Sequence, residues 1–153
     1  MVYAPTPERV VRAMLQLARV TPADVVVDLG SGDGRIPIAA ARDFGARGVG
    51  VEIDPNRIRE ATANLARAGL PSGAGVVFLN QDLFDADIGA ATVVTLFMSQ
   101  GVNLRVMPKL KRELRPGARV VSLYFDMGET WPPEQAHDVD GLMIYLWTIR
   151  QTP

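Results

Sequence analysis

The feature that most constrains the fold is the segment VVVDLGSGDGR at residues 25–35, where an apolar run meets three alternating glycines. A continuous apolar run of this kind favours a strand that is covered on both faces, as in a parallel sheet. Gly30, Gly32 and Gly34 carry no Cβ and adopt positive φ readily, so a ligand can lie against their backbone. We therefore predict a strand at 25–29, then a ligand-binding turn that leads into a helix. A tight turn that binds no ligand is the alternative.

The remaining sequence alternates strands and helices with short connections. The predicted strands span 47–54, 74–82, 91–98 and 118–126, and the predicted helices span 36–44, 55–68 and about 102–114. This alternation is typical of an α/β fold, in which helices cover both faces of a mostly parallel, doubly wound sheet. Ligands in such sheets bind at the carboxyl ends of the strands. A chain of 153 residues with 48% hydrophobic content suits a single domain, residues 1–153.

Both ends of the chain carry local signals. Thr6 and Pro7 are typical of a helix N-cap and first helical residue, and this helix ends before the TPAD segment at 21–24. Near the C-terminus, the Asp140–Gly141 pair separates HDV from LMIYLWTI, which predicts an antiparallel β-hairpin. Pro108 lies inside the helix predicted at about 102–114, and we expect it to kink or divide that helix.

The spacing of the glycines separates two classes of ligand. A dinucleotide fingerprint needs a third glycine where this chain has Arg35. The pattern here is GxGxG, with Asp28 before it and Asp33 inside it. Two carboxylates would repel a pyrophosphate but suit a ligand with an ammonium group, such as S-adenosylmethionine.

The glycine segment resembles the first motif of the class I S-adenosylmethionine-dependent methyltransferases, (D/E)xGxGxG. The resemblance implies a Rossmann-like, seven-stranded sheet with an antiparallel C-terminal hairpin, S-adenosyl-L-methionine as cofactor and S-adenosyl-L-homocysteine as product. It also implies that Glu52 accepts the ribose hydroxyls and that Asp82 reads the adenine amino group, with Leu83 near the ring. The residues expected at the cofactor are Asp28, Gly30, Ser31, Gly32, Gly34, Glu52, Ile53, Asp82 and Leu83. Glu52 and Asp82 as plain strand-end or capping acids are the alternatives.

Four further segments resemble prokaryotic relatives of the mitochondrial lysine methyltransferases that modify the ATP synthase c subunit and the adenine nucleotide translocase. They are YAPTP at 3–7, DLGSGDGR at 28–35, the long segment at 91–122 and YLWT at 145–148. The resemblance implies that Tyr3 and Thr6 lie over the cofactor in a helical lid, residues 1–20, above a catalytic core, residues 25–153. It also implies a protein lysine as the methyl acceptor.

The methyl acceptor is expected to approach beyond the ends of the fourth and fifth strands. There we predict Phe97, Tyr124 and Asp126 as the catalytic residues, because aromatic faces attract an alkylammonium group. Core packing of the two rings is the alternative. The segment TLFMSQ lacks the Asn/Asp-Pro-Pro-aromatic signature of enzymes that methylate nucleobases, so we expect no nucleic acid substrate.

Composition excludes several other classes of function. The net charge of −1 argues against a positive electrostatic field that would attract nucleic acid or anionic lipid. The lack of cysteine excludes disulfides, and with a single histidine it argues against a metal site. Because no run approaches the length of a bilayer span, we expect a cytoplasmic protein without membrane insertion. A basic cluster at 105–115 predicts a docking face for an acidic partner or, as the alternative, a solvated helix face.

Two alternatives to a lysine methyltransferase are open at this stage. One is a small-molecule methyltransferase whose open pocket is closed by a second copy of the chain in a homodimer. The other is a cofactor-binding regulatory module without catalysis.

Overall fold

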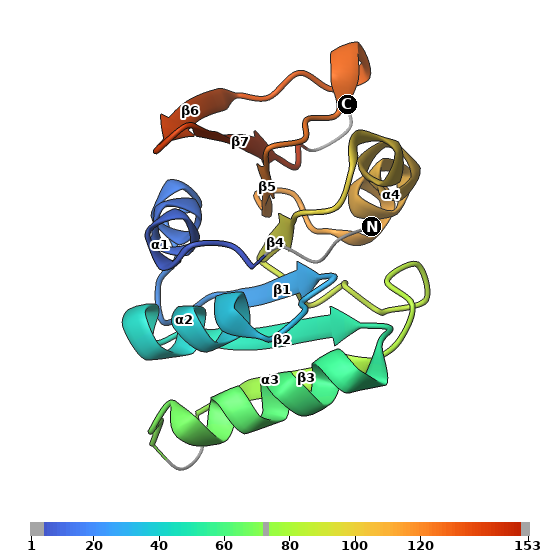
Figure 1. Ribbon diagram of the computed structural model, residues 1–153. Helices are drawn as coiled ribbons and strands as arrows, with labels where there is room; N and C mark the ends of the chain where they lie inside the picture. Colours follow the sequence, from blue (N-terminus) through green and yellow to red (C-terminus); the bar gives the residue numbers. More distant parts are fainter. Residues whose placement is uncertain (1–4, 72–73, 151–153) are drawn as a thin grey trace.

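The computed structural model describes residues 5–71 and 74–150, which form twelve elements along the chain (Figure 1). The α-helices are α1 (Glu8–Leu17), α2 (Arg35–Phe44), α3 (Pro55–Arg67) and α4 (Gln100–Glu113), and a short 3-10 helix, η1, spans Gly128–Thr130. The strands are β1 (Val25–Leu29), β2 (Arg47–Glu52), β3 (Val76–Asn80), β4 (Val93–Leu96), β5 (Arg119–Leu123), β6 (Gln135–Val139) and β7 (Leu142–Thr148). All the predicted strands and helices are present.

The strands form a seven-stranded sheet with the order β3-β2-β1-β4-β5-β7-β6. Strands β1 to β5 pair in parallel, whereas β7 pairs antiparallel with both β5 and β6. The predicted fold class is confirmed: the sheet is mostly parallel and ends in an antiparallel hairpin. Strand order reverses between β1 and β4, so the loops after these strands flank the crevice in which such sheets bind ligands.

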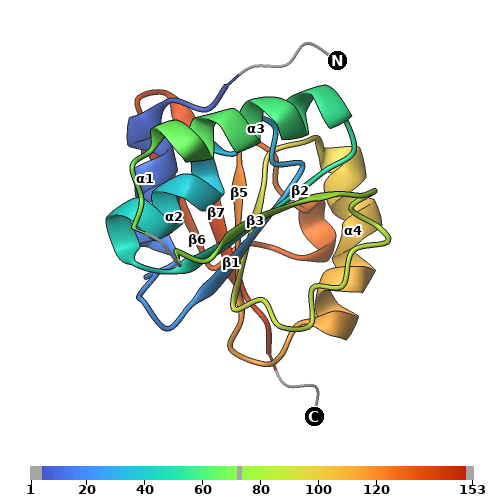
Figure 2. The ribbon, with the colours of Figure 1, turned by 90° about the horizontal axis from the view of Figure 1, so that it is seen from below.

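Two hydrophobic cores lie on opposite faces of the sheet. Helices α1 and α2 cover one face and α4 covers the other (Figure 2). Neighbouring residues of β1 belong to different cores, since Val26 packs in the first and Val27 in the second. This explains why the strand sequence is continuously apolar rather than alternating.

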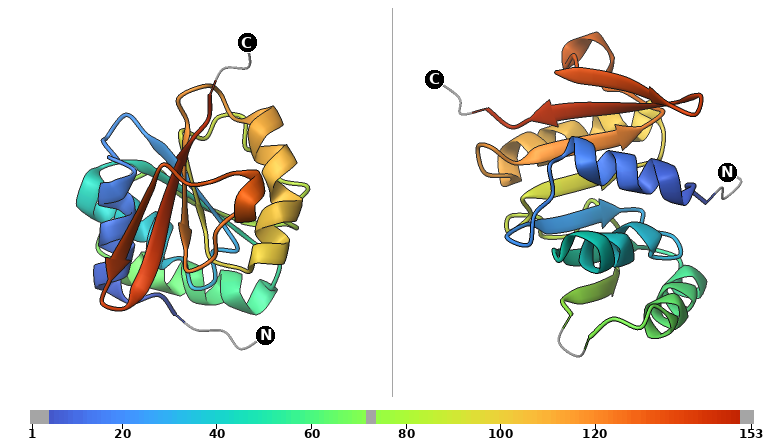
Figure 3. Two further views of the ribbon diagram at one scale, coloured as in Figure 1. Left: turned by 90° about the horizontal axis from the view of Figure 1, so that it is seen from above. Right: turned by 90° about the vertical axis from the view of Figure 1, so that its left-hand side faces the viewer.

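Helix α1 is part of the first core and not only a cover for the site. Its buried residues Val10, Val11, Met14 and Leu15 pack with residues of β5 and β7, and Figure 3 shows α1 lying along the sheet there. The segment 1–20, predicted as a lid, therefore contributes a core helix. Of the described residues in this segment, Pro5 and Thr6 line the pocket described below.

Local sequence signals predict the C-terminal hairpin correctly, but not the continuity of α4 through Pro108. Asp140 and Gly141 both have positive φ, 53° and 86°, as a two-residue hairpin turn requires. Pro108 does not divide the helix, because α4 runs through it from Gln100 to Glu113, and the kink, which is the other expectation, stays a prediction. Pro108 and Leu104, four residues before it, are both exposed, so water can reach the carbonyl that loses its amide partner.

Candidate functional site

A pocket of about 690 Å³ opens at the carboxyl edge of the parallel strands. Its walls come from the segment before α1, the glycine loop after β1, the end of β2, the loops after β4 and β5, and the start of β7. The lining residues are Pro5, Thr6, Asp28, Gly30, Ser31, Gly32, Asp33, Arg35, Ile36, Glu52, Phe97, Met98, Ser99, Tyr124, Phe125 and Leu142.

The glycine loop forms the floor of one half of this pocket. Gly30, Gly32 and Gly34 have φ values of 83°, 55° and 83°, which side-chain-bearing residues rarely adopt. The amides of Gly30 and Ser31 both donate to the carbonyl oxygen of Val51, at 2.8 and 3.0 Å, which joins the loop to β2. The predicted ligand-facing turn thus has the expected place and backbone.

Gly34 has a different role from the other two glycines, since it does not line the pocket. A Cβ at this position would lie 2.6 Å from the ring of Phe78 and 2.9 Å from Cβ of Ala61. Gly34 therefore allows close packing at the start of α2. Its predicted direct contact with a cofactor stays a prediction.

Glu52, at the end of β2, holds both the glycine loop and the start of α3. Its Oε1 accepts from the amide of Gly32 at 2.8 Å, and its Oε2 accepts from the amide of Asp54 at 3.0 Å. Asp54 itself caps α3, because its side chain accepts from the amide of Asn56. The side chain lines the pocket, and each oxygen of Glu52 can accept a further hydrogen bond.

Asp28 lines the same pocket and is only 4% exposed. Burial raises its pKa from 3.8 to about 7, opposed by a 2.8 Å hydrogen bond from the Thr95 hydroxyl and reinforced by the charges of Glu52 and Asp33. A buried carboxyl without a cationic partner favours its neutral form. A cationic ligand in the pocket would favour its ionised form.

Aromatic rings line the opposite half of the pocket. Phe97 stacks on Phe125 with ring centroids 6.3 Å apart, and Tyr124 meets Phe125 edge-on at 4.9 Å. Tyr124 is 57% exposed, so the alternative that it is a core residue is wrong. Phe97 both packs against the first core and lines the pocket.

The loop after β5 is held in an unusual conformation by buried polar groups. Strand β5 ends at Leu123, earlier than predicted, because Tyr124 adopts a positive φ of 70°. The buried Asn103 of α4 donates to the carbonyl oxygens of Phe125 and Asp126, at 3.0 and 3.2 Å. The Asn103 contacts fix the loop that carries the exposed Tyr124 ring.

Besides Gly34, four predicted site residues do not line the pocket: Ile53, Asp82, Leu83 and Asp126. Ile53 is 65% exposed, and Asp82 accepts from the amide of Phe84 at 2.9 Å, so it caps a turn after β3. Asp126 accepts from the side-chain amide of Gln100 at 2.6 Å. Their proposed contacts with ligands stay predictions, and Tyr3 lies outside the described residues.

The structure adds pocket residues that the sequence reasoning missed: Pro5, Arg35, Ile36 and Leu142. The prediction that Thr6 caps α1 is wrong. Pro7 holds the cap position without a side-chain bond, while Thr6 is buried and lines the pocket. A signal for Arg35 was present in its position directly after GSGDG and two residues after its partner Asp33, but its second partner, the Thr6 carbonyl, lies 29 residues earlier in the chain.

The basic cluster of α4 is not a uniform cationic face. Lys109 is buried, and its Nζ lies 2.8 Å from a carboxylate oxygen of Glu113. Arg105 and Lys111 lie over the rings of Phe84 and Trp131, at 4.8 and 4.7 Å from the centroids. Lys109, Arg105 and Lys111 thus have partners within the fold, whereas the side chain of Arg112 is 68% exposed.

The described residues form neither a metal-binding cluster nor a membrane-spanning helix. Within residues 5–71 and 74–150, no group of three or more His, Asp or Glu side chains is placed to hold a metal ion. None of the helices in these ranges combines the length and apolar character that crossing a bilayer requires.

Comparison with known proteins places the chain in a family. Residues 28–135 match the ANTKMT methyltransferase domain. A protein-lysine N-methyltransferase of Saccharolobus islandicus is 49% identical over 152 residues, covering 96% of this chain and 92% of that protein. The adenine nucleotide translocase lysine N-methyltransferase of Mus musculus is 37% identical over 132 residues, covering 86% of this chain but only 56% of the mouse protein.

A solved structure agrees with this assignment. An RNA methyltransferase from Salinibacter ruber, in complex with S-adenosyl-L-homocysteine, has a TM-score of 0.93 to this chain at 50% identity, covering 98% of this chain and 96% of that chain. The chain therefore belongs to the ANTKMT methyltransferase domain family, and it is an S-adenosylmethionine-dependent methyltransferase.

Proposed function

We propose that the chain transfers a methyl group from S-adenosylmethionine to the side-chain amine of lysine residues in proteins. The observation that carries this proposal is the charge of the five loops that directly follow β1 to β5. These loops are residues 30–34, 53–54, 81–92, 97–99 and 124–127. Four of the five carry an aspartate and none contains lysine or arginine. Such an edge attracts a cationic lysine and repels a phosphate backbone.

The residues of the glycine-loop half fit the cofactor. The chain offers backbone without Cβ atoms at Gly30 and Gly32, a carboxylate with acceptor capacity at Glu52, and a buried carboxyl at Asp28. These groups suit the nucleoside backbone contact, the ribose diol and the ammonium group, respectively. When bound, the cofactor supplies a methyl group on a positively charged sulfur.

The aromatic half of the pocket fits the acceptor. Phe97, Phe125 and Tyr124 offer ring faces and edges to an alkylammonium, which is attracted to aromatic faces and loses water on entry. Loss of water also favours the neutral amine that must attack the methyl group. The main task of these residues is thus to align one nitrogen and keep bulk water away.

RNA is the second candidate acceptor, because the Salinibacter ruber protein that is 50% identical to this chain is named an RNA methyltransferase. The acidic loops speak against RNA, whose binding requires neutralisation of phosphates by lysine and arginine. A small molecule enclosed by a second copy of the chain is a third outcome of the test below. The lack of cysteine and of any described membrane-spanning helix leads us to infer action in the cytoplasm.

The test uses cofactor with a tritiated methyl group and the full chain. The purified protein is incubated with host protein, host RNA and a low-molecular-weight extract in separate reactions. Labelled products are then treated with protease or ribonuclease, and labelled protein is hydrolysed for amino acid analysis. The variant Glu52→Ala, which should lose cofactor affinity, is the matched control for contaminating enzymes.

We expect label in protease-sensitive, ribonuclease-resistant material that yields methylated lysine, and little label with Glu52→Ala. Label that ribonuclease releases would assign RNA as the acceptor and refute the proposal. Label confined to the small-molecule extract would refute it as well and favour the enclosed-pocket alternative.

A further inference from the structure

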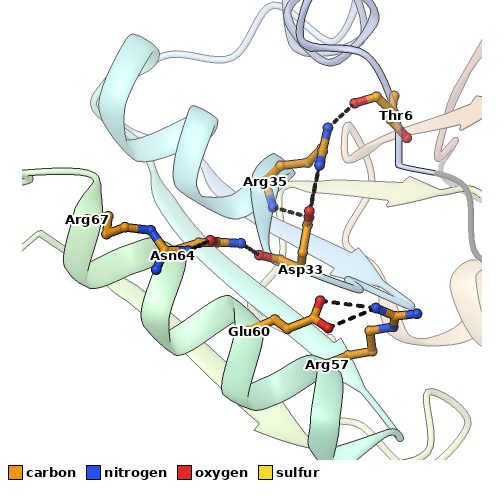
Figure 4. A network of polar contacts seen from close by, with 7 residues as sticks. All are labelled: Thr6, Asp33, Arg35, Arg57, Glu60, Asn64 and Arg67. Carbon is orange, nitrogen blue, oxygen red and sulfur yellow. Dashed lines mark hydrogen bonds and ion pairs between the residues drawn. The ribbon is translucent and has the colours of Figure 1, made fainter.

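Arg35 joins two walls of the pocket that lie far apart in the sequence (Figure 4). Its Nε and Nη2 donate to the carboxylate of Asp33, with distances of 3.1 and 2.6 Å to the two oxygens. Its Nη1 donates to the main-chain carbonyl of Thr6 at 2.7 Å. A single guanidinium therefore links the glycine loop to the segment that precedes α1.

The geometry explains why arginine, and not lysine, occupies this position. The guanidinium is a rigid fork, so two of its nitrogens can hold one carboxylate while the third reaches a separate acceptor. A lysine ammonium is a single point of donation and cannot span both partners in this way. The Arg35 and Asp33 side chains are only 28% and 14% exposed, so solvent competes weakly for these bonds.

Asp33 is held from its other side as well. The side-chain amide of Asn64 in α3 donates to the main-chain carbonyl of Asp33 at 3.0 Å, and Arg67 donates in turn to Asn64 (Figure 4). A continuous set of contacts thus runs from α3 through the glycine loop and Arg35 to Thr6. Because Arg35 already binds the Asp33 carboxylate, Asp28 is the better placed acid for the ammonium group of a ligand.

The segment before α1 is anchored at two ends. On its C-terminal side, α1 is fixed in the first core by Val10 and Met14. On its N-terminal side, the link from Arg35 holds the Thr6 carbonyl, while Pro5 and Thr6 line the pocket. Removal of the Arg35 link would free this wall without disturbing the core packing of the helix.

We propose that Arg35 is a positioning residue that couples the glycine loop to residues 5–7, so that a ligand bound on the loop fixes both walls of the pocket together. The inference rests on the proposed cofactor site and adds a role for a residue outside the predicted contacts. A ligand that orders residues 30–34 also steadies Asp33, and through Arg35 it steadies Thr6. Occupancy of the glycine loop thereby fixes the pocket wall that Pro5 and Thr6 form.

Hydrogen–deuterium exchange of the full chain, with and without saturating S-adenosyl-L-homocysteine, tests this coupling. The peptides to follow cover residues 5–14 and 28–36. The variant is Arg35→Lys, and the matched control is Arg57→Lys, since Arg57 pairs with Glu60 inside α3 and does not line the pocket. Calorimetry gives the dissociation constant of each variant for the same ligand.

In the wild type and in Arg57→Lys, we expect the ligand to slow exchange in both peptides. In Arg35→Lys, protection of residues 28–36 should persist and protection of residues 5–14 should be lost, with a dissociation constant about five-fold higher or more. Equal protection of residues 5–14 in Arg35→Lys and the wild type would overturn the inference. Lack of ligand binding by the wild type would instead refute the proposed cofactor site.

Should Arg35→Lys fail to fold, the variant Asp33→Asn decides the question. It keeps the size of the loop side chain and removes the charge that orients the guanidinium. The expected result is the same selective loss of protection in residues 5–14, and full protection there would again overturn the inference.

Discussion

The substitution Asp28→Asn should change the stability of the ligand-free chain in a pH-dependent way, because the carboxyl it removes is buried. Asp28 is 4% exposed, and burial raises its pKa from 3.8 to about 7 in the folded chain. A group whose folded pKa is raised contributes stability that is complete below the unfolded pKa and is lost as the pH rises through the folded pKa. The wild type therefore loses stability from this group between about pH 4 and pH 7.

The magnitude follows from the difference between the two pKa values. At about 1.4 kcal/mol for each pKa unit, the ionised Asp28 costs the fold about 4 kcal/mol above pH 7, and part of this cost is already present at pH 5. Asparagine does not titrate, and its Oδ1 can still accept from the Thr95 hydroxyl. The stability of Asp28→Asn relative to the wild type should therefore rise by about 2 to 3 kcal/mol between pH 5 and pH 8.

Urea denaturation of both proteins at pH 5, 6, 7 and 8, without ligand, measures this difference. The matched control is Asp43→Asn, because the hydrogen bond from Arg42 lowers the pKa of the Asp43 carboxyl. Its effect should be constant between pH 5 and pH 8, since Asp43 is ionised throughout that range. A stability difference between Asp28→Asn and the wild type that does not change with pH would refute the reasoning.

Four further outcomes test other parts of the site. Binding of S-adenosyl-L-homocysteine near pH 7 should release about half a proton per ligand, because a pKa of about 7 leaves Asp28 half protonated; calorimetry in buffers of different ionisation enthalpy measures the release, and Asp28→Asn should abolish it. Glu52→Ala should weaken cofactor binding by about 1 to 3 kcal/mol, and unchanged affinity in calorimetry would remove Glu52 from the site. Gly34→Ala should destabilise the chain by about 2 to 4 kcal/mol in urea denaturation, because positive φ and the ring of Phe78 both oppose a Cβ. Asn103→Leu should lower kcat/KM for the acceptor about ten-fold at unchanged cofactor affinity, since it releases only the loop after β5; equal losses for both ligands would contradict this role.

The sequence by itself determined the local backbone and, through it, the fold class and the position of the site. Continuous apolar runs predict buried parallel strands, and the glycines at 30, 32 and 34 predict a turn that all three φ values confirm. Asp140–Gly141 predicts the hairpin for the same reason, since a two-residue turn needs positive φ. These signals are readable because they depend on residues that are close in the chain.

Only the tertiary structure decided which side chains meet. The link from Asp33 through Arg35 to Thr6 and the packing of Gly34 against Phe78 each join elements that sequence patterns do not pair, and the burial of Lys109 depends on the surrounding fold. The raised pKa of Asp28 is also a tertiary property, because strands and loops on several sides exclude water from it. The backbone conformation of a residue depends on its neighbours in the chain. The hydrogen-bond partners, the burial and the pKa of a side chain depend instead on distances across the folded chain.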